Sequence, residues 1–336
     1  MNKNYFEHKI KAVEADNNFK HVMAITLDPR TNYRKGLVRC IISRSGNLVF
    51  KGNIDRSELH LITADSLEHF KIGERLKIES EEEIISKLIP EGGDFIGLED
   101  PDIWIDETTD LMHLYFTIPI IIDHKNKKTQ IHLGHAVGKS LDSLKMTMPV
   151  LIARENDRAK EVSIAPLNSK GFRYNLIESK DRQTDISYST VKVAIVEDMG
   201  KSWKYGGIAF HPAEHNIPWI AGHASPGPLF SKNFIDVGEG RLLGIINGRE
   251  TNQKIGDEIK YGIFSVGLFI YDYENGKIDW VSSKPFIRDS EAKIITFASQ
   301  FVETEPGKGI LYAHIDDSFV RAYTLEAEKI KKLLPK

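Results

Sequence analysis

Short stretches in which β-branched and aromatic residues alternate with polar ones recur along the whole chain, and Asn, Asp or Gly separates them. An alternation of two places successive side chains on opposite faces of a strand, whereas a helix repeats its apolar positions every three or four residues. The clearest stretches are Leu37–Ser43, Leu59–Ala64, Ile103–Ile105, His113–Ile118, His132–Val137, Val191–Glu197, Leu242–Ile246, Gly262–Tyr271, Gly309–His314 and Val320–Leu325. The pattern predicts an all-β protein.

Two segments have a helical pattern instead. Glu81–Leu88 follows Ser80, and Ser80 and Glu83 have the spacing of a capping box, in which each side chain bonds the backbone of the other. Leu325–Leu334 is amphipathic and ends in a Lys-Leu-Leu-Pro-Lys tail. We therefore expect one short inserted helix and one C-terminal helix.

An irregular repeat also runs through the chain, in which an apolar strand is followed by a polar turn and then by a hydrophobic or aromatic residue. Its copies are Leu61–Phe70, His135–Leu144, Ala194–Trp203 and Leu268–Trp280, with a degenerate fifth copy at Val320–Ala327. The spacing of about 55 to 75 residues fits a four-stranded blade plus an insertion. The sequence thus predicts a single five-bladed β-propeller domain over residues 1–336, with a central funnel where side chains distant in sequence meet.

Composition narrows the class of protein. The 336 residues include 45 Lys and Arg against 48 Asp and Glu, a formal net charge of -3, so no basic field favours nucleic acid or an anionic membrane. The longest uncharged apolar stretch, Tyr261–Tyr271, is far shorter than the roughly 20 residues that span a bilayer, and residues 1–20 lack the apolar segment of a signal peptide. We expect a soluble, cytoplasmic protein.

The single cysteine, Cys40, cannot form an internal disulfide and lies in an apolar strand pattern, which indicates a core residue.

Other motifs point to structure and not to chemistry. None of the 12 histidines has the spacing of a metal site, so we expect no metal and no cofactor. Val196–Trp203 partly matches the Asp-box turn of sialidase propellers, and its expected role is a hairpin whose Trp203 packs between sheets.

The most informative stretch is Gly97-Leu-Glu-Asp-Pro-Asp-Ile-Trp104, in which two adjacent carboxylates and a proline open a strand. It resembles the Gly-x-Glu-Asp-Pro-Arg-Ile motif of glycoside hydrolase family 130, five-bladed propeller enzymes that cleave β-mannosides by phosphorolysis or hydrolysis. The resemblance implies that Asp100 is the general acid, and that the acid acts through a hydroxyl of the bound mannosyl ring.

Further stretches resemble elements of the same family in the same order and extend the likeness over residues 56–325. They are Arg56–Phe70, Lys160–Pro166, Ala224–Leu229 with Leu242–Arg249, and Ile310–Asp316. Two positions depart from the pattern of the phosphorylases: Asp102 replaces an arginine, and Asn247 replaces a histidine. An anion in place of a cation would repel phosphate by about 4 kcal/mol per close pair at an effective dielectric near 20. Hydrolysis is therefore expected over phosphorolysis.

Inverting glycoside cleavage requires one carboxyl that protonates the leaving oxygen and one carboxylate that activates water. Asp100 is the candidate acid, and Glu161 and Glu250 are the candidate bases. Glu99 points to the other side of the strand and is expected to be structural. The competing structural interpretations are a turn cap for Asp100 and surface ion pairs for the two glutamates.

The candidate ligands for sugar hydroxyls are Lys160, His223, Asn247, Arg249, His314 and Asp316, the last with its neighbour Asp317. The predicted partner is an oligosaccharide or glycoside, and the sequence leaves homo-oligomer formation open. Two alternatives remain: a propeller glycosidase of the arabinan, xylan or fructan type, and a non-catalytic glycan-binding propeller.

Overall fold

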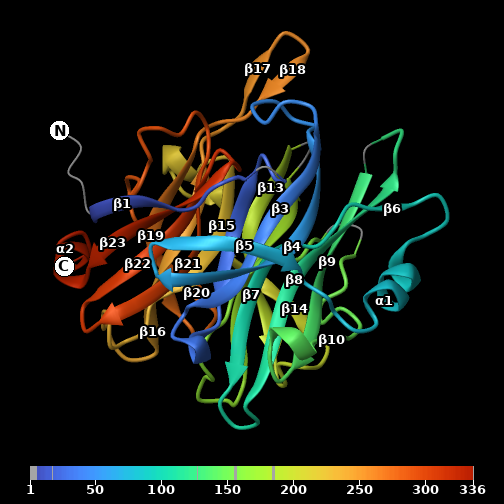
Figure 1. Cartoon of the computed structure of the whole chain (residues 1–336). Helices are drawn as coiled ribbons and strands as arrows, with labels where there is room; N and C mark the ends of the chain where they lie inside the picture. Colours follow the sequence, from blue (N-terminus) through green and yellow to red (C-terminus); the bar gives the residue numbers. More distant parts are fainter. Residues whose placement is uncertain (1–5, 17, 127, 155–156, 184–185, 336) are drawn as a thin grey trace.

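The computed structural model describes residues 6–16, 18–126, 128–154, 157–183 and 186–335, and these residues form mostly β-strands with short helices between them (Figure 1). The all-β prediction is therefore confirmed. Within the described residues, no helix is long and apolar enough to cross a membrane.

Most strands belong to five antiparallel sets of four, which we number in chain order. The first set is β2 (Val22–Leu27), β3 (Lys35–Ser45), β4 (Ile54–Ser66) and β5 (His69–Arg75). The second set is β7 (Glu99–Asp106), β8 (Leu111–Asp123), β9 (Lys128–Gly138) and β10 (Lys145–Met146), with β6 (Asp94–Phe95) also paired to β8. The third set is β11 (Lys160–Ser163), β12 (Arg173–Gln183), β13 (Ile186–Val196) and β14 (Lys204–Phe210).

The fourth set is β15 (His223–Leu229), β16 (Arg241–Arg249), β19 (Phe264–Asp272) and β20 (Lys277–Val281). The fifth set is β21 (Thr296–Glu305), β22 (Lys308–Ile315), β23 (Phe319–Glu326) and β1 (Phe6–Val13). One parallel pair, Ser189 with His223, joins the third and fourth sets into an eight-stranded sheet. The hairpin of β17 (Gln253–Ile255) and β18 (Glu258–Lys260) projects from the top of the view in Figure 1.

The copies of the sequence repeat lie at the same place in each set of strands. Each of its four full copies covers the turn between the third and fourth strand of a set, for example the turn between β4 and β5. The degenerate fifth copy covers β23, which pairs with β1 from the other end of the chain. No such turn follows β23, and this explains why the fifth copy is incomplete.

The first strands of the sets contact one another in succession. β2 contacts β7, β7 contacts β11, β11 contacts β15, β15 contacts β21, and β21 contacts β2. Apolar side chains fill the space between successive sets in the same order. One such cluster joins the last set to the first and includes Val22 and Val38 together with Tyr312 and Val320. This arrangement brings the starts of the first strands together.

Three of these first strands carry a bulge at the same place. The pairing register shifts at Ala24 in β2, at Asp100 in β7 and at Glu161 in β11, where φ is 46°, 48° and 50°. A left-handed residue in a bulge bends the strand and changes the direction of its side chain, at a cost for any residue with a Cβ. The bulges therefore fix where Asp100 and Glu161 point.

The helices agree only in part with the sequence. α1 (Glu81–Leu88) has the predicted bounds, but Ser80 has φ 64° and its side chain makes no cap hydrogen bond, so the capping-box prediction is wrong. The C-terminal helix α2 covers only Ala327–Lys331, because the residues before it continue β23. Cys40 is fully buried and unpaired in β3, and Trp203 is buried between the second and third sets, as predicted.

Candidate active site

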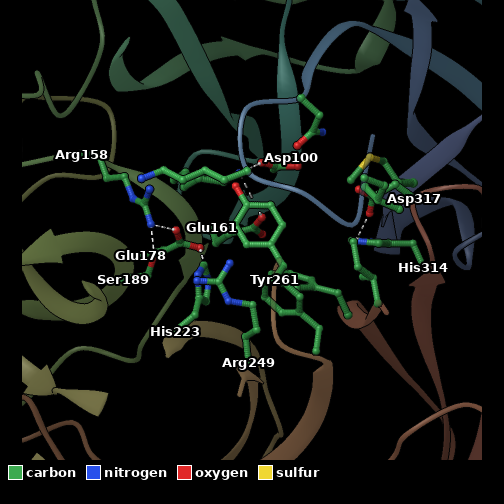
Figure 2. Close-up of a pocket in the computed structure, with 18 of the residues that line it drawn as sticks. Asp100, Arg158, Glu161, Glu178, Ser189, His223, Arg249, Tyr261, His314 and Asp317 are labelled. Atoms are coloured by element: carbon green, nitrogen blue, oxygen red, sulfur yellow. Dashed lines mark hydrogen bonds and ion pairs between the residues drawn. The ribbon is translucent and has the colours of Figure 1, made fainter. Parts of the chain in front are cut away.

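A pocket of about 410 Å³ opens where the first strands begin. Because the strands of a set are antiparallel, the start of each first strand lies beside the end of the second strand, and both contribute side chains. Asp100 and Glu161 come from β7 and β11, whereas Glu178 and Arg249 come from β12 and β16. Figure 2 shows these side chains around one space, although they are far apart in sequence.

Asp100 is buried between two cations. Its Oδ1 accepts a hydrogen bond from Nη1 of Arg39 at 3.0 Å, and its Oδ2 lies 2.9 Å from Nζ of Lys160. Burial alone would raise the pKa of Asp100, but the charges of Lys160 and Arg39 outweigh it and hold that pKa well below its usual range. Asp100 is therefore a carboxylate at neutral pH.

Glu161 has the opposite electrostatic environment. Burial raises the pKa of Glu161 well above its usual value, and the adjacent negative charge of Asp100 raises it further. The nearest cation, Nζ of Lys160, is 3.9 Å from Oε1 and is already in contact with Asp100. The raised pKa of Glu161 beside the lowered pKa of Asp100 favours a protonated Glu161 next to an ionised Asp100.

Glu178 is the third carboxylate of the pocket. It forms an ion pair with Arg158 and a hydrogen bond with Nε2 of His223 at 3.2 Å, and Arg158 also bonds Ser189 (Figure 2). Burial would raise the pKa of Glu178, but His223 and Arg158 lower it below its usual value. Burial also lowers the pKa of His223 to about 4, so this histidine is neutral at pH 7 and donates its Nε2 proton to Glu178.

His314 and Asp317 form a second histidine–carboxylate pair, at the right of Figure 2 and across the pocket from Glu178. Nδ1 of His314 accepts a hydrogen bond from the backbone N–H of Ala24, which leaves Nε2 to donate to Asp317 at 3.2 Å. The His314 ring stacks on Phe297 at 5.1 Å between ring centres. Burial would raise the pKa of Asp317, but the His314 hydrogen bond and nearby arginines lower it. Asp317 is therefore also ionised.

Six of the nine predicted site residues line this pocket. They are Asp100, Lys160, Glu161, His223, Arg249 and His314. The other three, Asn247, Glu250 and Asp316, lie outside its lining.

The side chains of these three residues bond elsewhere in the fold. The Asn247 amide bonds the backbone of Ala298 in both directions, at 2.8 and 2.9 Å, and is fully buried between two sets. Glu250 pairs with Arg288 at 3.5 Å. Asp316 accepts three backbone N–H bonds from residues 293–295, whereas its neighbour Asp317 faces the pocket. All three side chains therefore make contacts within the fold and lie outside the lining of the pocket.

Asp102 does not line the pocket either, so the expected repulsion of phosphate by this residue has no place in the structure. Burial raises the pKa of Asp102 to about 7. Glu99, next to Asp100, is buried against Arg39 and behind the pocket, as expected for a structural residue.

Sequence reasoning missed several charged residues of the pocket, above all Arg39, Arg158 and Glu178. Arg39 gave one signal, since it is the single charge within the apolar run Leu37–Ile42. Arg158 and Glu178 gave none, because they belong to stretches rich in charges of both signs.

The side chains that line the pocket can transfer protons and form charged hydrogen bonds with a ligand. Two carboxyls whose surroundings push their pKa values apart are the usual sign of an acid and base assignment. Asp100 and Glu161 share one cation, because Nζ of Lys160 lies 2.9 Å from Oδ2 of Asp100 and 3.9 Å from Oε1 of Glu161. The two carboxyls therefore face the same part of the pocket. Among the described residues, no group of three or more His, Cys, Asp or Glu side chains is arranged to hold a metal ion.

No family model matches the sequence, and no curated protein matches it either. The fold, in contrast, is that of mannoside phosphorylases and hydrolases, and the resemblance to glycoside hydrolase family 130 is confirmed at this level. The chain is similar to the β-1,2-mannobiose phosphorylase of Listeria innocua, with a TM-score of 0.64 and 10% identity over 97% of this chain and 99% of that one.

A second similar structure comes from the GH130 family of mannoside phosphorylases, which contains glycoside hydrolases that target β-1,2 mannosidic linkages in Candida mannan. It has a TM-score of 0.67 and 16% identity over 96% of this chain and 95% of that one. An exo-1,5-α-L-arabinanase from a bovine ruminal metagenomic library is also similar, with a TM-score of 0.51 and 13% identity over 92% of this chain and 94% of that one.

Proposed function

We propose that this chain is a divergent member of glycoside hydrolase family 130, folded as a single five-bladed propeller, which cleaves β-mannosides or related glycosides with inversion. The succession of contacts from β2 through β7, β11, β15 and β21 back to β2 supports the propeller, because five blades closing on a central funnel require it. The likeness to mannoside-active enzymes supports the substrate class.

The observation that carries the proposal is the pair of carboxyls, Asp100 and Glu161, that the bulges of β7 and β11 bring to the same lysine in the pocket. The family resemblance assigns the general acid to Asp100, but two cations hold Asp100 ionised, and burial keeps the proton on Glu161. We therefore assign the proton that reaches the leaving oxygen to Glu161, with the charge of Asp100 retaining it there until substrate binds. Glu178 and Asp317 are the ionised carboxylates available to activate water from the other side.

We still propose that water, and not phosphate, accepts the glycosyl group, but the reason is no longer repulsion of phosphate by Asp102. Neither Asp102 nor Asn247 offers a cation to the pocket, and the cations beside the proton-carrying pair, Arg39 and Lys160, are already neutralised by Glu99 and Asp100. A free phosphate at the reacting carbon would have to compete with these carboxylates.

The test is a reducing-sugar assay on a panel of β-mannosides, xylosides and arabinosides, each with and without inorganic phosphate. We expect turnover of a mannoside at the same rate in both buffers. Preference for an arabinoside would favour the alternative glycosidase, and release of a sugar 1-phosphate only when phosphate is present would contradict hydrolysis. Binding of a glycan without turnover of any glycoside would show a non-catalytic propeller.

A further inference from the structure

The charged side chains of the pocket are unevenly paired. Five are cations and four are carboxylic acids: Arg39, Lys51, Arg158, Lys160 and Arg249 against Asp100, Glu161, Glu178 and Asp317. Arg39 and Lys160 contact Asp100 and Glu99, and Arg158 contacts Glu178. Two cations, Arg249 and Lys51, are left over.

Arg249 is largely buried at the end of β16. Its Cζ lies 4.6 Å from the ring centre of Tyr261 and 5.3 Å from that of Phe264, and its one hydrogen bond goes to the Gly222 carbonyl at 3.4 Å. Its Nε has no partner, and no carboxylate of the described residues lies within 4.0 Å of the guanidinium. Burial lowers the pKa of Arg249 to about 10, so the group stays charged at neutral pH. A guanidinium in this position has donors left for an anion.

Lys51 lies at the rim of the same pocket. Its side chain is exposed and has no ion pair with any described residue. Its backbone N–H donates to the Ile259 carbonyl at 2.9 Å, and the Tyr261 N–H donates to the Val49 carbonyl at 2.9 Å. These bonds tie the turn carrying Lys51 to the β17–β18 hairpin, so both unpaired cations belong to one wall of the pocket.

This wall stands apart from the proton-carrying pair. Among the described residues Arg249 has no ion pair with Asp100 or Glu161, which contact Lys160 instead, and Figure 2 shows Arg249 and Asp100 at opposite ends of the pocket. An anion held there would therefore lie away from the reacting carbon, as part of the substrate and not as the attacking group. The aromatic rings of Tyr261 and Phe264 add the apolar surface on which a sugar ring packs beside that anion.

We propose that the pocket selects glycosides in which one sugar carries an oxyanion, a carboxylate or a phosphate ester, that pairs with Arg249 and Lys51. This rests on the proposed glycosidase function. The oxyanion supplies the negative charge that Arg249 and Lys51 do not have nearby. Its attraction to the buried guanidinium offsets the free energy lost when that group left water.

The test compares β-mannosyl-glucose with matched disaccharides that carry a carboxylate on one or the other ring, or a phosphate ester. We expect kcat/KM to be about tenfold or more higher for a charged substrate, as for other partly buried ion pairs. Arg249→Gln should remove this preference, read as the ratio of kcat/KM for the charged to the neutral disaccharide, and Lys51→Gln should reduce it. Arg241→Gln is the matched control, because Arg241 begins the same strand, pairs with Asp279 at 2.9 Å and lies outside the pocket. The carboxylate and phosphate arms identify which oxyanion is bound.

Equal kcat/KM for charged and neutral disaccharides in the wild type would overturn the inference and leave the glycosidase function intact. So would cleavage that requires free phosphate and is slowed by Arg249→Gln. If no disaccharide is cleaved, the proposed function fails, and calorimetry with a hexuronic acid and its parent hexose then decides the inference alone. Tighter binding of the acid that Arg249→Gln abolishes would support it, and equal or undetectable binding of both would overturn it. Lys51→Gln, on an exposed side chain, keeps the test valid if Arg249→Gln does not fold.

Discussion

The carboxyl groups of Asp100 and Glu161 meet at the bulges of two different strands, and their pKa values are shifted in opposite directions. Asp100 is paired with Arg39 and Lys160 at 3.0 and 2.9 Å, whereas Glu161 is buried next to a negative charge. Both residues have a left-handed backbone, with φ of 48° and 50°. Such strain is retained where the surrounding structure holds it, and often where a function depends on it.

Replacement of Asp100 by Asn removes the negative charge that keeps the proton on Glu161, the proposed acid, so kcat should fall by up to roughly 10²–10⁴, the usual contribution of acid and base catalysis. Asn tolerates a left-handed backbone well, but it removes a charge that Arg39 and Lys160 share. We therefore expect the free energy of unfolding to fall as well, by about 1–3 kcal/mol, as for a lost hydrogen bond to a charged group. Steady-state kinetics and thermal unfolding measure the two effects.

Asp102→Asn is the matched control for Asp100→Asn, two residues further along the same strand. Asp102 does not line the pocket, so turnover should stay near that of the wild type. Wild-type turnover by Asp100→Asn would remove Asp100 from the mechanism.

Glu161→Gln should abolish most of the activity without lowering stability at neutral pH. The folded protein keeps a proton on Glu161 that the unfolded chain, with an ordinary pKa of 4.5, has lost at pH 7, so the wild-type glutamate opposes folding as the pH rises above 4.5. Gln has the shape of the protonated acid and no such cost. The variant should melt at the wild-type temperature or above it at pH 7, and the gain should vanish near pH 4.

Glu250→Gln removes a glutamate outside the pocket and should leave turnover unchanged. A clear destabilisation of Glu161→Gln at pH 7 would mean that Glu161 is ionised in the folded protein, against our assignment of the proton.

Buried neutral histidines should make the fold sensitive to acid. Burial lowers the pKa of His132 to about 4 and that of His135 to about 3, and Nδ1 of His132 accepts a hydrogen bond from the Ala153 N–H at 2.9 Å. The unfolded chain takes up protons first as the pH falls below 6.5, so stability is full above that pH and is lost progressively down to the folded pKa values.

His132→Gln should make the melting temperature fall less steeply between pH 7 and pH 4. In the wild type, protonation of His132 alone lowers the free energy of unfolding by up to about 3 kcal/mol over this range. The variant itself will be less stable at pH 7, so the slope of melting temperature against pH is the quantity to compare. An unchanged slope would contradict a neutral buried His132.

Ala24 occupies the same bulge position in β2 as Asp100 and Glu161 do in their strands, with φ 46° but with no functional group. Ala24→Gly should relieve the backbone strain and stabilise the fold by about 1 kcal/mol, because the strain of a left-handed residue exceeds the entropy that glycine adds to the unfolded chain. Ala313→Gly, at an ordinary buried strand position in β22, should destabilise by a similar amount. Chemical denaturation of both variants measures the difference, and a loss of stability in Ala24→Gly would contradict the strain.

The sequence alone determined the local elements of this protein. Alternation identified the second and third strands of the sets, such as those containing Leu37–Ser43 and His113–Ile118, because these strands are buried and carry the β-branched and aromatic side chains. The repeat located the turns between third and fourth strands, since turn chemistry depends on a few adjacent residues. The bounds of α1 were equally local.

The tertiary structure decided which polar residues share the pocket. β11, which carries Lys160 and Glu161, is only four residues long and gave no clear pattern of its own. Asp316 and Asp317 are adjacent, and only the backbone at the end of β22 determines that Asp317 faces the pocket while Asp316 bonds residues 293–295. Arg39, Asp100 and Lys160 meet because β3 and β11, which belong to different sets, both pack against β7. Side-chain direction at a bulge and proximity between sheets depend on long-range packing, so residue types and spacing alone could not determine them.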